Sequence, residues 1–264
     1  MHKYKKSIRE ILVQAAIKVE KTRDILLWRI LSIGGNREDK GIRRCHFLIL
    51  NNPRYLKVGK IAIDSFLARN RDYLAIVHTD ATLHDSVLEL ADKSLFKNRI
   101  EIVLSTSDTH WTEQKFKLLM SMQGLNDLYL DVDTRCNKRI KTGDQVTCFV
   151  DDGNVLKQEP YCSILEILPK ESFPQKSRML NTTFFTWNGQ TIADNTQVIE
   201  LFNKIFHSTA AYSKERLAEQ ITVSILVANN FQNYGALKKN DTSFDRGIIE
   251  SSYLGATERF IYRR

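Results

Sequence analysis

The sequence lacks the features that build disulfide-rich, secreted or membrane-spanning proteins. Its four cysteines show no C-x-x-C spacing, which argues against a zinc site and favours free thiols in a reducing compartment. No stretch of about 18 residues is both apolar and uncharged, so no transmembrane helix is expected. The basic start is not followed by the short hydrophobic segment of a secretory signal. We therefore expect a cytoplasmic protein, either free or held peripherally on the inner face of a membrane.

Several nucleotide-binding and hydrolase motifs are missing as well. There is no G-x-x-x-x-G-K-[ST] loop, no G-x-G-x-x-G turn, no G-x-S-x-G elbow and no H-E-x-x-H pair. These motifs supply backbone amides around phosphates, an exposed serine nucleophile, or a pair of zinc-binding imidazoles. A function that depends on one of those devices is not expected.

Positive charge is concentrated at the N-terminal end. Residues 1–44 hold twelve Lys and Arg against five Asp and Glu, a net charge of +7 out of +8 for the whole chain. A nucleic-acid-binding domain spreads its basic residues over a folded face, so no nucleic acid partner is expected. We interpret residues 1–44 as a basic helix and linker ahead of a nearly neutral domain.

Apolar side chains in residues 7–32 follow helical spacing, with basic side chains between them. A basic amphipathic helix of this kind has two interpretations. It can lie on an anionic membrane surface, here through residues 1–34. It can equally pack on the main domain and leave its charged face in water.

From residue 45 onward, predicted strands and helices alternate. Strands are expected over 45–50, 73–78, 100–104 and 128–130, separated by helices over 58–68, 82–95 and 112–122. Two further strands, over 146–150 and 178–187, precede helices over 195–207 and 214–229. Repeated β-α-β units predict an α/β fold with a mostly parallel sheet, right-handed crossovers and flanking helices.

The strand expected at 128–130 delivers two carboxylates, Asp131 and Asp133, where it ends. In an extended chain, side chains at i and i+2 point to the same side. Paired carboxylates suit a hard cation such as Mg²⁺ or Mn²⁺, which keeps waters and binds substrate phosphates. Ligands bind beyond the carboxyl ends of parallel strands, so Asp80 and Asp108 are expected to face the same crevice.

With these units in place, the chain resembles the nucleotide-sugar glycosyltransferases of the GT-A fold, in particular glycosyltransferase family 8 and its relatives. Residues 52–55, 61–70 and 75–80 are similar to the opening strand, helix and second strand of that family. Leu128 to Asp133 is similar to its Y-L-D-x-D strand, and Leu180 to Phe185 to its F-N-x-G strand about fifty residues later. The resemblance spans roughly residues 45–190.

The resemblance implies a GT-A-like, Rossmann-like catalytic domain over residues 45–264. Its nucleotide-binding half would cover about 45–135 and its acceptor half about 136–264. Asp131 and Asp133 would hold Mn²⁺ or Mg²⁺ against the diphosphate of a nucleotide-diphosphate sugar, with a UDP-sugar as the first expectation. The metal would act as a Lewis acid on the departing nucleoside diphosphate.

The same resemblance assigns further residues. Tyr55 would stack on the base, Asn52 would read it, and Lys115 or Lys117 would reach a phosphate. The expected donor-binding residues are Asn52, Tyr55, Asp80, Lys117 and Asp131. Contacts to the donor sugar or acceptor are expected from Asn181, Glu219 and Gln220, with Asn181 and Gln220 as the catalytic residues. The lysines, Glu219 and Gln220 could equally form solvated helix faces, and Asn181 could be structural.

Two departures from the family pattern bear on mechanism. Thr183 stands where the family has glycine, two residues after the strand asparagine. The family also supplies a histidine near its C-terminus as a third metal ligand, whereas the last histidine here is His207, in a predicted helix. Asp241, Asp245, Glu258 or water would have to replace it.

The sequence thus predicts a metal-dependent glycosyltransferase of the hexosyltransferase type. Its acceptor would be a saccharide or a lipid-linked sugar, as in bacterial surface polysaccharide or lipopolysaccharide synthesis. A sugar-phosphate nucleotidyltransferase is an alternative, although residues 50–53 lack the glycine of its phosphate loop. A nucleic-acid-binding module using the basic arm is another. A haloacid-dehalogenase phosphatase would need D-x-D-x-T, and here the last position is Arg135.

Overall fold

The structure is a computed structural model of the 264-residue chain. It describes residues 15, 19, 22–23, 25–30, 43–105, 109–136, 139–150, 180–192, 195–209, 218–238 and 249–251. Of the predicted features, Asp108 and the three acidic candidates for a third metal ligand lie outside these residues.

Seven strands form one sheet in the order β3-β2-β1-β4-β7-β6-β8. Their bounds are β1 Arg43–Ile49, β2 Tyr73–Thr79, β3 Ile100–Leu104, β4 Leu128–Leu130, β6 Thr147–Val150, β7 Leu180–Thr186 and β8 Gly235–Lys238. The first four strands run parallel, and β7 is antiparallel to both β4 and β6. A second, two-stranded sheet pairs β5 (Thr134–Cys136) with β9 (Ile249–Ser251). The predicted α/β class with a mostly parallel sheet is confirmed.

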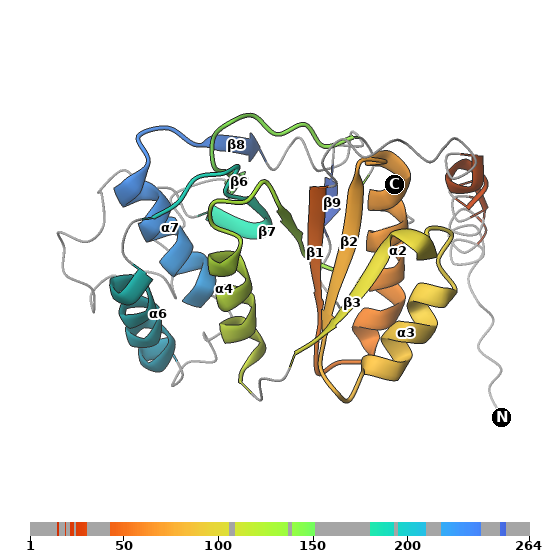
Figure 1. The fold of residues 1–264 in the computed structure, drawn as a ribbon, viewed down its shortest axis with the longest axis horizontal. Coiled ribbons are helices and arrows are strands. Elements are labelled where there is room, and N and C mark those ends of the chain that lie inside the picture. The colour runs from red at the N-terminus through yellow and green to blue at the C-terminus, as the bar shows by residue number, and fades with distance from the viewer. Residues whose placement is uncertain are drawn as a thin grey trace, which may run out of the picture.

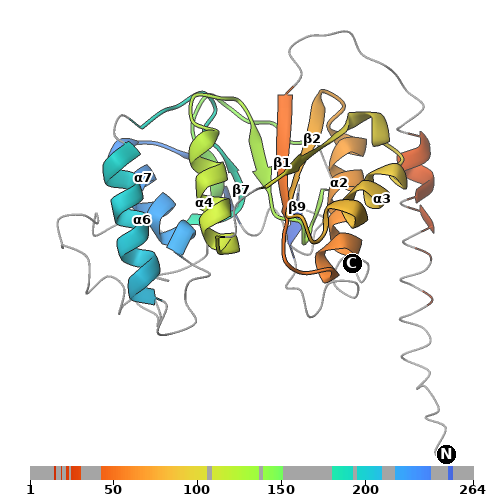
Figure 2. The ribbon, with the colours of Figure 1, turned by 60° about the horizontal axis from the view of Figure 1, so that its bottom comes forward.

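The helices fall into two groups on either side of β1 and β4 (Figures 1 and 2). Their bounds are α2 Arg54–Arg69, α3 His84–Asp92, α4 Trp111–Ser121, α6 Asn195–Thr209 and α7 Ala218–Asn230, with a 3-10 turn at Lys97–Arg99. Helices α2 and α3 lie beside β1, β2 and β3, whereas α4, α6 and α7 gather at the other end of the sheet. Each group covers its own hydrophobic core.

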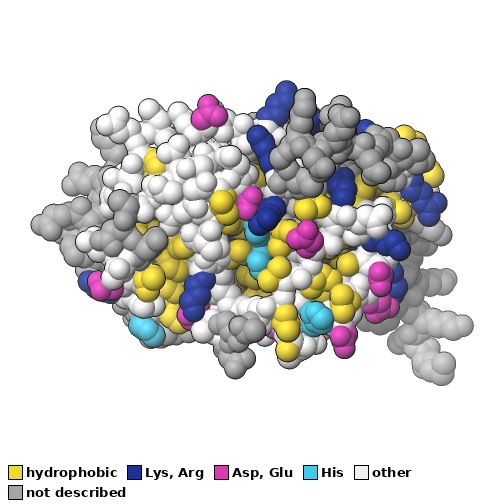
Figure 3. Space-filling model, in the orientation of Figure 1, with side chains coloured by type: hydrophobic (Ala, Val, Ile, Leu, Met, Phe, Trp, Pro, Cys, Tyr) yellow, Lys and Arg dark blue, Asp and Glu magenta, His cyan; other side chains and the backbone are white. Residues whose placement is uncertain are grey.

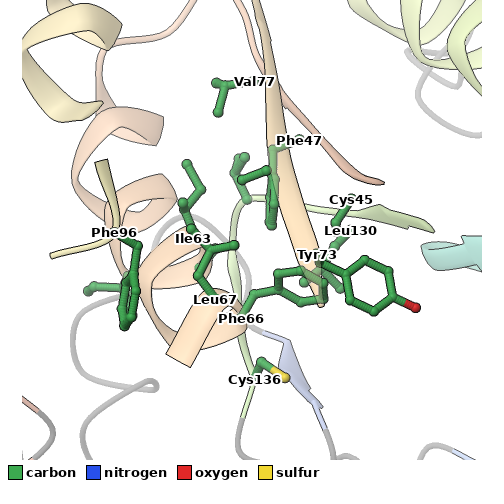
Figure 4. Packing of buried hydrophobic residues seen from close by; sticks show 14 of the residues in the cluster. Cys45, Phe47, Ile63, Phe66, Leu67, Tyr73, Val77, Phe96, Leu130 and Cys136 are labelled. Atoms are coloured by element: carbon green, nitrogen blue, oxygen red, sulfur yellow. The ribbon is translucent and has the colours of Figure 1, made fainter. Parts of the chain in front are cut away.

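Strand β4 lies between these two cores. Leu128 and Leu130 belong to the first core, with residues of β1, β2, α2 and α3, while Tyr129 belongs to the second core, with residues of α4, α6, α7 and β7. The first core is built around Phe66, whose ring meets the rings of Phe47 and Tyr73 edge to face (Figure 4). Because successive side chains alternate across a strand, β4 is buried on both faces and its carboxyl end is fixed.

Most predicted elements are confirmed within a few residues, but three strands escape the sequence prediction. Strands β5 and β9 have three residues each, too few to show a period, and their partners are over 100 positions apart. Strand β8 begins at Gly235, where a Cβ would lie 2.7 Å from Thr147 Oγ1. Glycine is therefore required there for close packing of β8 on β6.

The N-terminal helix contacts the main domain through Trp28. This side chain is only 5% exposed and belongs to the first core. The interpretation that the helix packs on the domain is therefore confirmed at this residue. Within the described part of the chain, no helix is long and apolar enough to cross a membrane.

Candidate active site

The candidate site forms where the carboxyl ends of β1, β2 and β4 meet. Because β1 pairs in parallel with both β2 and β4, the segments that follow these strands share one edge of the sheet. Asp80, just after β2, accepts a hydrogen bond from the backbone N–H of Asn51, just after β1. Asp131 follows β4 directly.

Asp131 is held from three sides. Its Oδ1 accepts hydrogen bonds from Lys115 Nζ at 2.9 Å and from the Tyr129 hydroxyl at 2.7 Å. Its backbone N–H donates to Thr183 O at 2.8 Å, which ties it to β7. The second oxygen, Oδ2, has no hydrogen-bond partner among the residues that the structure describes, and the side chain is 26% exposed. One carboxylate oxygen is thus oriented by Lys115 and Tyr129, while the other makes no hydrogen bond to the described residues.

Lys115 is a buried cation between two carboxylates. Its ammonium lies 2.9 Å from Asp131 Oδ1 and 3.6 Å from Glu219 Oε1, and 5.0 Å from the centre of the Tyr129 ring. Burial alone would lower the pKa of Lys115, but the Asp131 and Glu219 carboxylates outweigh it and raise the pKa. The ammonium therefore stays charged and is held by both carboxyl groups.

Glu219 completes this cluster from α7. Its Oε1 accepts a hydrogen bond from Thr182 Oγ1 at 3.4 Å, while its Oε2 is buried and has no hydrogen-bond partner within the described part of the chain. Burial raises the pKa of Glu219 to about 7, although Lys115 acts in the opposite direction. A buried polar atom without a partner is uncommon, and here it belongs to a carboxyl group beside Lys115.

Asp133 is strongly perturbed as well. Burial, and then the negative charge of Asp131, raise the pKa of Asp133 to about 7. The two residues of the D-x-D are therefore close enough to repel one another. The geometry differs from the expected extended strand, because β4 ends at Leu130 and residues 132–133 form a turn, closed by a Thr134 Oγ1 hydrogen bond to Asp131 O at 2.6 Å.

The residues present fit a hard divalent cation. An open carboxylate oxygen on Asp131 and a neighbouring acid with a raised pKa are what a cation would use and neutralise. The described residues contain no group of three or more metal-binding side chains. Mg²⁺-like ions at phosphate sites are commonly held by one or two carboxylates, with waters and substrate oxygens completing the shell. Asp131 and Asp133 would be the protein ligands of such an ion.

Asp80 has a structural task at this edge. Its Oδ1 accepts hydrogen bonds from the backbone N–H of Thr82 at 2.9 Å and of Leu83 at 3.0 Å. Burial raises its pKa, but these hydrogen bonds and the one from Asn51 prevail and lower it. The carboxylate thus shapes the turn before α3. Its predicted contact with a donor stays a prediction.

Asn52 and Tyr55 lie together at the start of α2. Asn52 Oδ1 accepts the backbone N–H of Arg54 at 3.1 Å, and the N–H of Tyr55 donates to Asn52 O at 3.0 Å. Tyr55 is half-buried and packs against the first core. The structure brings both residues to the edge where β1 ends, next to Asp80, and their role toward a base stays a prediction.

Of the two lysines on α4, Lys115 rather than Lys117 enters the cluster. Lys117 Nζ pairs with Glu113 at 2.6 Å, and its side chain is 59% exposed. Residues two apart on a helix lie about 200° apart around its axis, so Lys117 points away from Asp131. The placement of Lys117 does not favour its predicted donor contact, and the predicted contact of Lys115 with a phosphate stays a prediction.

Asn181 and Gln220 lie beside residues of the cluster. Asn181, on β7, accepts the backbone N–H of Thr183 at 2.9 Å, and Thr183 O holds Asp131. Gln220 is half-buried and follows Glu219 on α7. The side chain that reaches Lys115 is Glu219. The sequence pattern of α7 does not indicate which of its side chains reaches Lys115, because the helix is buried on nearly all sides.

No protein-family model matches the chain, and no curated protein sequence matches it. Several solved structures are similar in backbone arrangement. The galactosyltransferase LgtC, in complex with donor and acceptor sugar analogs, is 14% identical over 74% of this chain and 72% of its own, with a TM-score of 0.49. Mouse xyloside xylosyltransferase 1 is 12% identical over 74% and 84%, with a TM-score of 0.49. Glycosyltransferase GlyE of Streptococcus pneumoniae TIGR4 is 13% identical over 75% and 45%, with a TM-score of 0.45.

Replacing Glu219 by Gln is expected to remove part of the pH dependence of stability in the metal-free protein. The folded-state pKa of about 7 exceeds the ordinary 4.5, so folding favours the protonated acid. The contribution of protonated Glu219 to the free energy of unfolding is full below about pH 4.5 and is lost as the pH rises through about 7. Urea unfolding should show a wild-type decline over this range that exceeds the variant's by about 1–3 kcal/mol.

The matched control is Glu113→Gln, which removes the partner of Lys117 on the partly exposed side of α4. It should leave the wild-type pH dependence unchanged. A smaller decline remains in Glu219→Gln because Asp133 titrates in the same range. Identical pH profiles for Glu219→Gln and wild type would contradict a buried acid at this position.

Proposed function

We propose that the protein is a metal-dependent glycosyltransferase that moves a sugar from a nucleotide-diphosphate sugar, in the first place a UDP-sugar, to a saccharide or lipid-linked acceptor. The observation that carries this proposal is the state of Asp131. One of its oxygens is fixed by Lys115 and Tyr129, and the other has no partner among the described residues. This geometry lies at the sheet edge where α/β proteins bind nucleotides.

The division of labour follows from the contacts. Asp131 and Asp133 would hold Mn²⁺ or Mg²⁺, which supplies a Lewis acid for the charge on a leaving diphosphate. Lys115 orients Asp131 through its hydrogen bond. Tyr129 holds the same oxygen, and because burial, followed by the charge of Asp131, raises its pKa well above the usual value, its hydroxyl remains a donor. Each group is ordered before substrate arrives, which lowers the cost of binding.

The remaining predicted residues take the places that surround this centre. Tyr55 and Asn52, at the start of α2, would receive the base. Asn181 and Gln220, beside Thr183 and Glu219, would face the donor sugar or the acceptor. Glu219, expected with them, would act from beneath this centre, because its buried carboxyl group lies 3.6 Å from the Lys115 ammonium.

The sugar-phosphate nucleotidyltransferase and the nucleic-acid-binding module are not favoured. The first needs a glycine-rich phosphate loop after β1. The turn there is made by Asn51, whose φ is +55°, and its backbone N–H is occupied by Asp80. A nucleic-acid-binding module that uses the basic N-terminal arm would not require a carboxylate pair beside a buried lysine.

The N-terminal helix offers a surface for a membrane. Val19, Leu26 and Ile30 are 68%, 54% and 66% exposed. At about 100° per residue they share one side of the helix, and the buried Trp28 lies on the opposite side. The N-terminal helix therefore packs on the domain through one side and exposes apolar side chains on the opposite side. Together with the net charge of +7 in residues 1–44, this arrangement suits an anionic lipid surface, where a lipid-linked precursor of a bacterial surface polysaccharide would be presented.

The enzymatic proposal predicts a metal-dependent thermal shift. UDP or a UDP-sugar with saturating Mn²⁺ should raise the Tm of the wild-type protein by about 5 °C or more, and either component alone should raise it less. Asp133→Ala should lose the cooperative part of the shift, whereas Asp144→Ala, at an exposed acid elsewhere, should keep it. If GDP-, UDP- and CMP-sugars all fail to shift the wild type, the proposal is wrong.

The membrane proposal predicts selective binding to anionic vesicles. The wild-type protein should sediment with vesicles that contain phosphatidylglycerol and stay in solution with pure phosphatidylcholine. The double variant Leu26→Asp, Ile30→Asp should bind at least about tenfold more weakly, because it places charge in the apolar row. Ile199→Asp, at a 52% exposed position on α6, is the matched control. Equal sedimentation of the double variant and wild type would rule out this surface.

A further inference from the structure

A chain of three polar side chains crosses the sheet away from the candidate active site. His46 on β1 lies between Asp127, the residue before β4, and His78 on β2. His46 Nε2 is 3.1 Å from Asp127 Oδ2, and His46 Nδ1 is 2.9 Å from His78 Nε2. The two imidazoles are stacked with their centres 5.2 Å apart. Side chains thus connect β4, β1 and β2 on one face of the sheet.

The Asp127 carboxylate fixes the direction of one of these hydrogen bonds. A carboxylate only accepts, so His46 Nε2 carries the proton that Asp127 binds. The His46 Nδ1 and His78 Nε2 atoms share one proton between them, and its donor depends on the tautomers of the two rings. Burial, followed by the proximity of His46, lowers the pKa of His78 to about 4, which keeps His78 neutral near pH 7. Both hydrogen bonds of this chain are therefore made by neighbouring side chains within the sheet.

The burial of this chain makes it more than a surface contact. His46 and Asp127 are 8% and 9% exposed, and His78 is half-buried. On the face drawn in Figure 3, histidine side chains lie near the middle of the molecule, bordered by hydrophobic side chains. Buried hydrogen bonds are stronger than exposed ones, and a broken one leaves an unsatisfied group. Among the described residues, no group of three or more His, Cys, Asp or Glu side chains is placed to hold a metal ion. The contacts among Asp127, His46 and His78 are therefore not explained as a metal centre.

Strand β4 needs such support. It has three residues and pairs with β1 at only two positions, Cys45 with Leu128 and His46 with Tyr129. Its other neighbour, β7, also pairs with it at two positions. By comparison, β1 and β2 pair along seven residues. The side-chain bond from His46 to Asp127 therefore adds a contact at the start of β4, where its backbone pairing begins.

We propose that Asp127 and His46 are positioning residues that lock the start of β4 onto β1, and so hold Asp131 and the D-x-D turn in register with Lys115. His78 is the outer support of this lock. The consequence for catalysis rests on the proposed glycosyltransferase function, whereas the lock itself is a property of the fold and can be measured without substrate.

Hydrogen exchange followed by mass spectrometry tests the lock directly. In Asp127→Ala, amides of residues 128–134 should exchange about tenfold faster than in the wild type, because local opening of β4 becomes easier. Asp127→Asn retains an acceptor oxygen and should restore most of the protection. Ser94→Ala, which removes a buried hydrogen bond to Asp64 in the α2 and α3 layer, is the matched control and should leave exchange at 128–134 unchanged.

If Asp127→Ala does not fold, the variant His78→Ala replaces it. His78 is half-buried, and its substitution removes only the hydrogen bond between His78 and His46. About threefold faster exchange at 128–134, with no change in α2 and α3, is then expected. Unchanged exchange at 128–134 in the folded variant overturns the proposal, as does an equal effect of Ser94→Ala.

A second readout separates this inference from the proposed function. Mn²⁺ affinity, measured by electron paramagnetic resonance without nucleotide, should fall about tenfold in Asp127→Ala and little in Asp127→Asn, as for residues that orient metal ligands. If the wild type binds no Mn²⁺, the proposed function fails while the exchange data still decide the lock. If the wild type binds Mn²⁺ and Asp127→Ala binds it equally well, the positioning role fails.

Discussion

The interaction on which the rest of the site depends is the buried ammonium of Lys115 between the carboxylates of Asp131 and Glu219. Removing the Lys115 charge from water is costly, and the cost is offset only when opposite charges and hydrogen bonds are well placed. Lys115 lies on α4, Asp131 follows β4 and Glu219 lies on α7. One cation thus joins three elements, and it leaves Asp131 with a fixed oxygen and an open one.

The two hydrophobic cores supply the rigidity that this arrangement requires. Strand β4 contributes Leu128 and Leu130 to one core and Tyr129 to the other, so the turn that carries Asp133 begins from a strand fixed on both faces. Backbone pairing of β4 is short, and side chains complete it: Tyr129 and Lys115 at the carboxyl end, Asp127 and His46 at the amino end. The site is therefore a property of packing around β4 as much as of its carboxylates.

The sequence predicted the elements well because their signals are local. Apolar runs marked β1 to β4, and polar residues at their ends marked Asp131 and Asp133. What it could not predict depends on contacts between distant segments: the meeting of Lys115 with Glu219, 104 positions apart, and the pairing of β5 with β9. Helical spacing alone could have separated Lys115 from Lys117. The bond from Asp80 to the Asn51 backbone could not be predicted either, because it joins the ends of two different strands.

The central claim is that Asp131 and Asp133 hold a divalent cation against a nucleoside diphosphate. Its most direct test is anomalous diffraction from crystals grown with Mn²⁺ and UDP. The account predicts a manganese peak at ligand distance, about 2.2 Å, from the open oxygen of Asp131 and from the Asp133 carboxylate, with diphosphate oxygens completing the shell. Ordered UDP with no manganese peak at these carboxylates, or with manganese bound elsewhere, would contradict it.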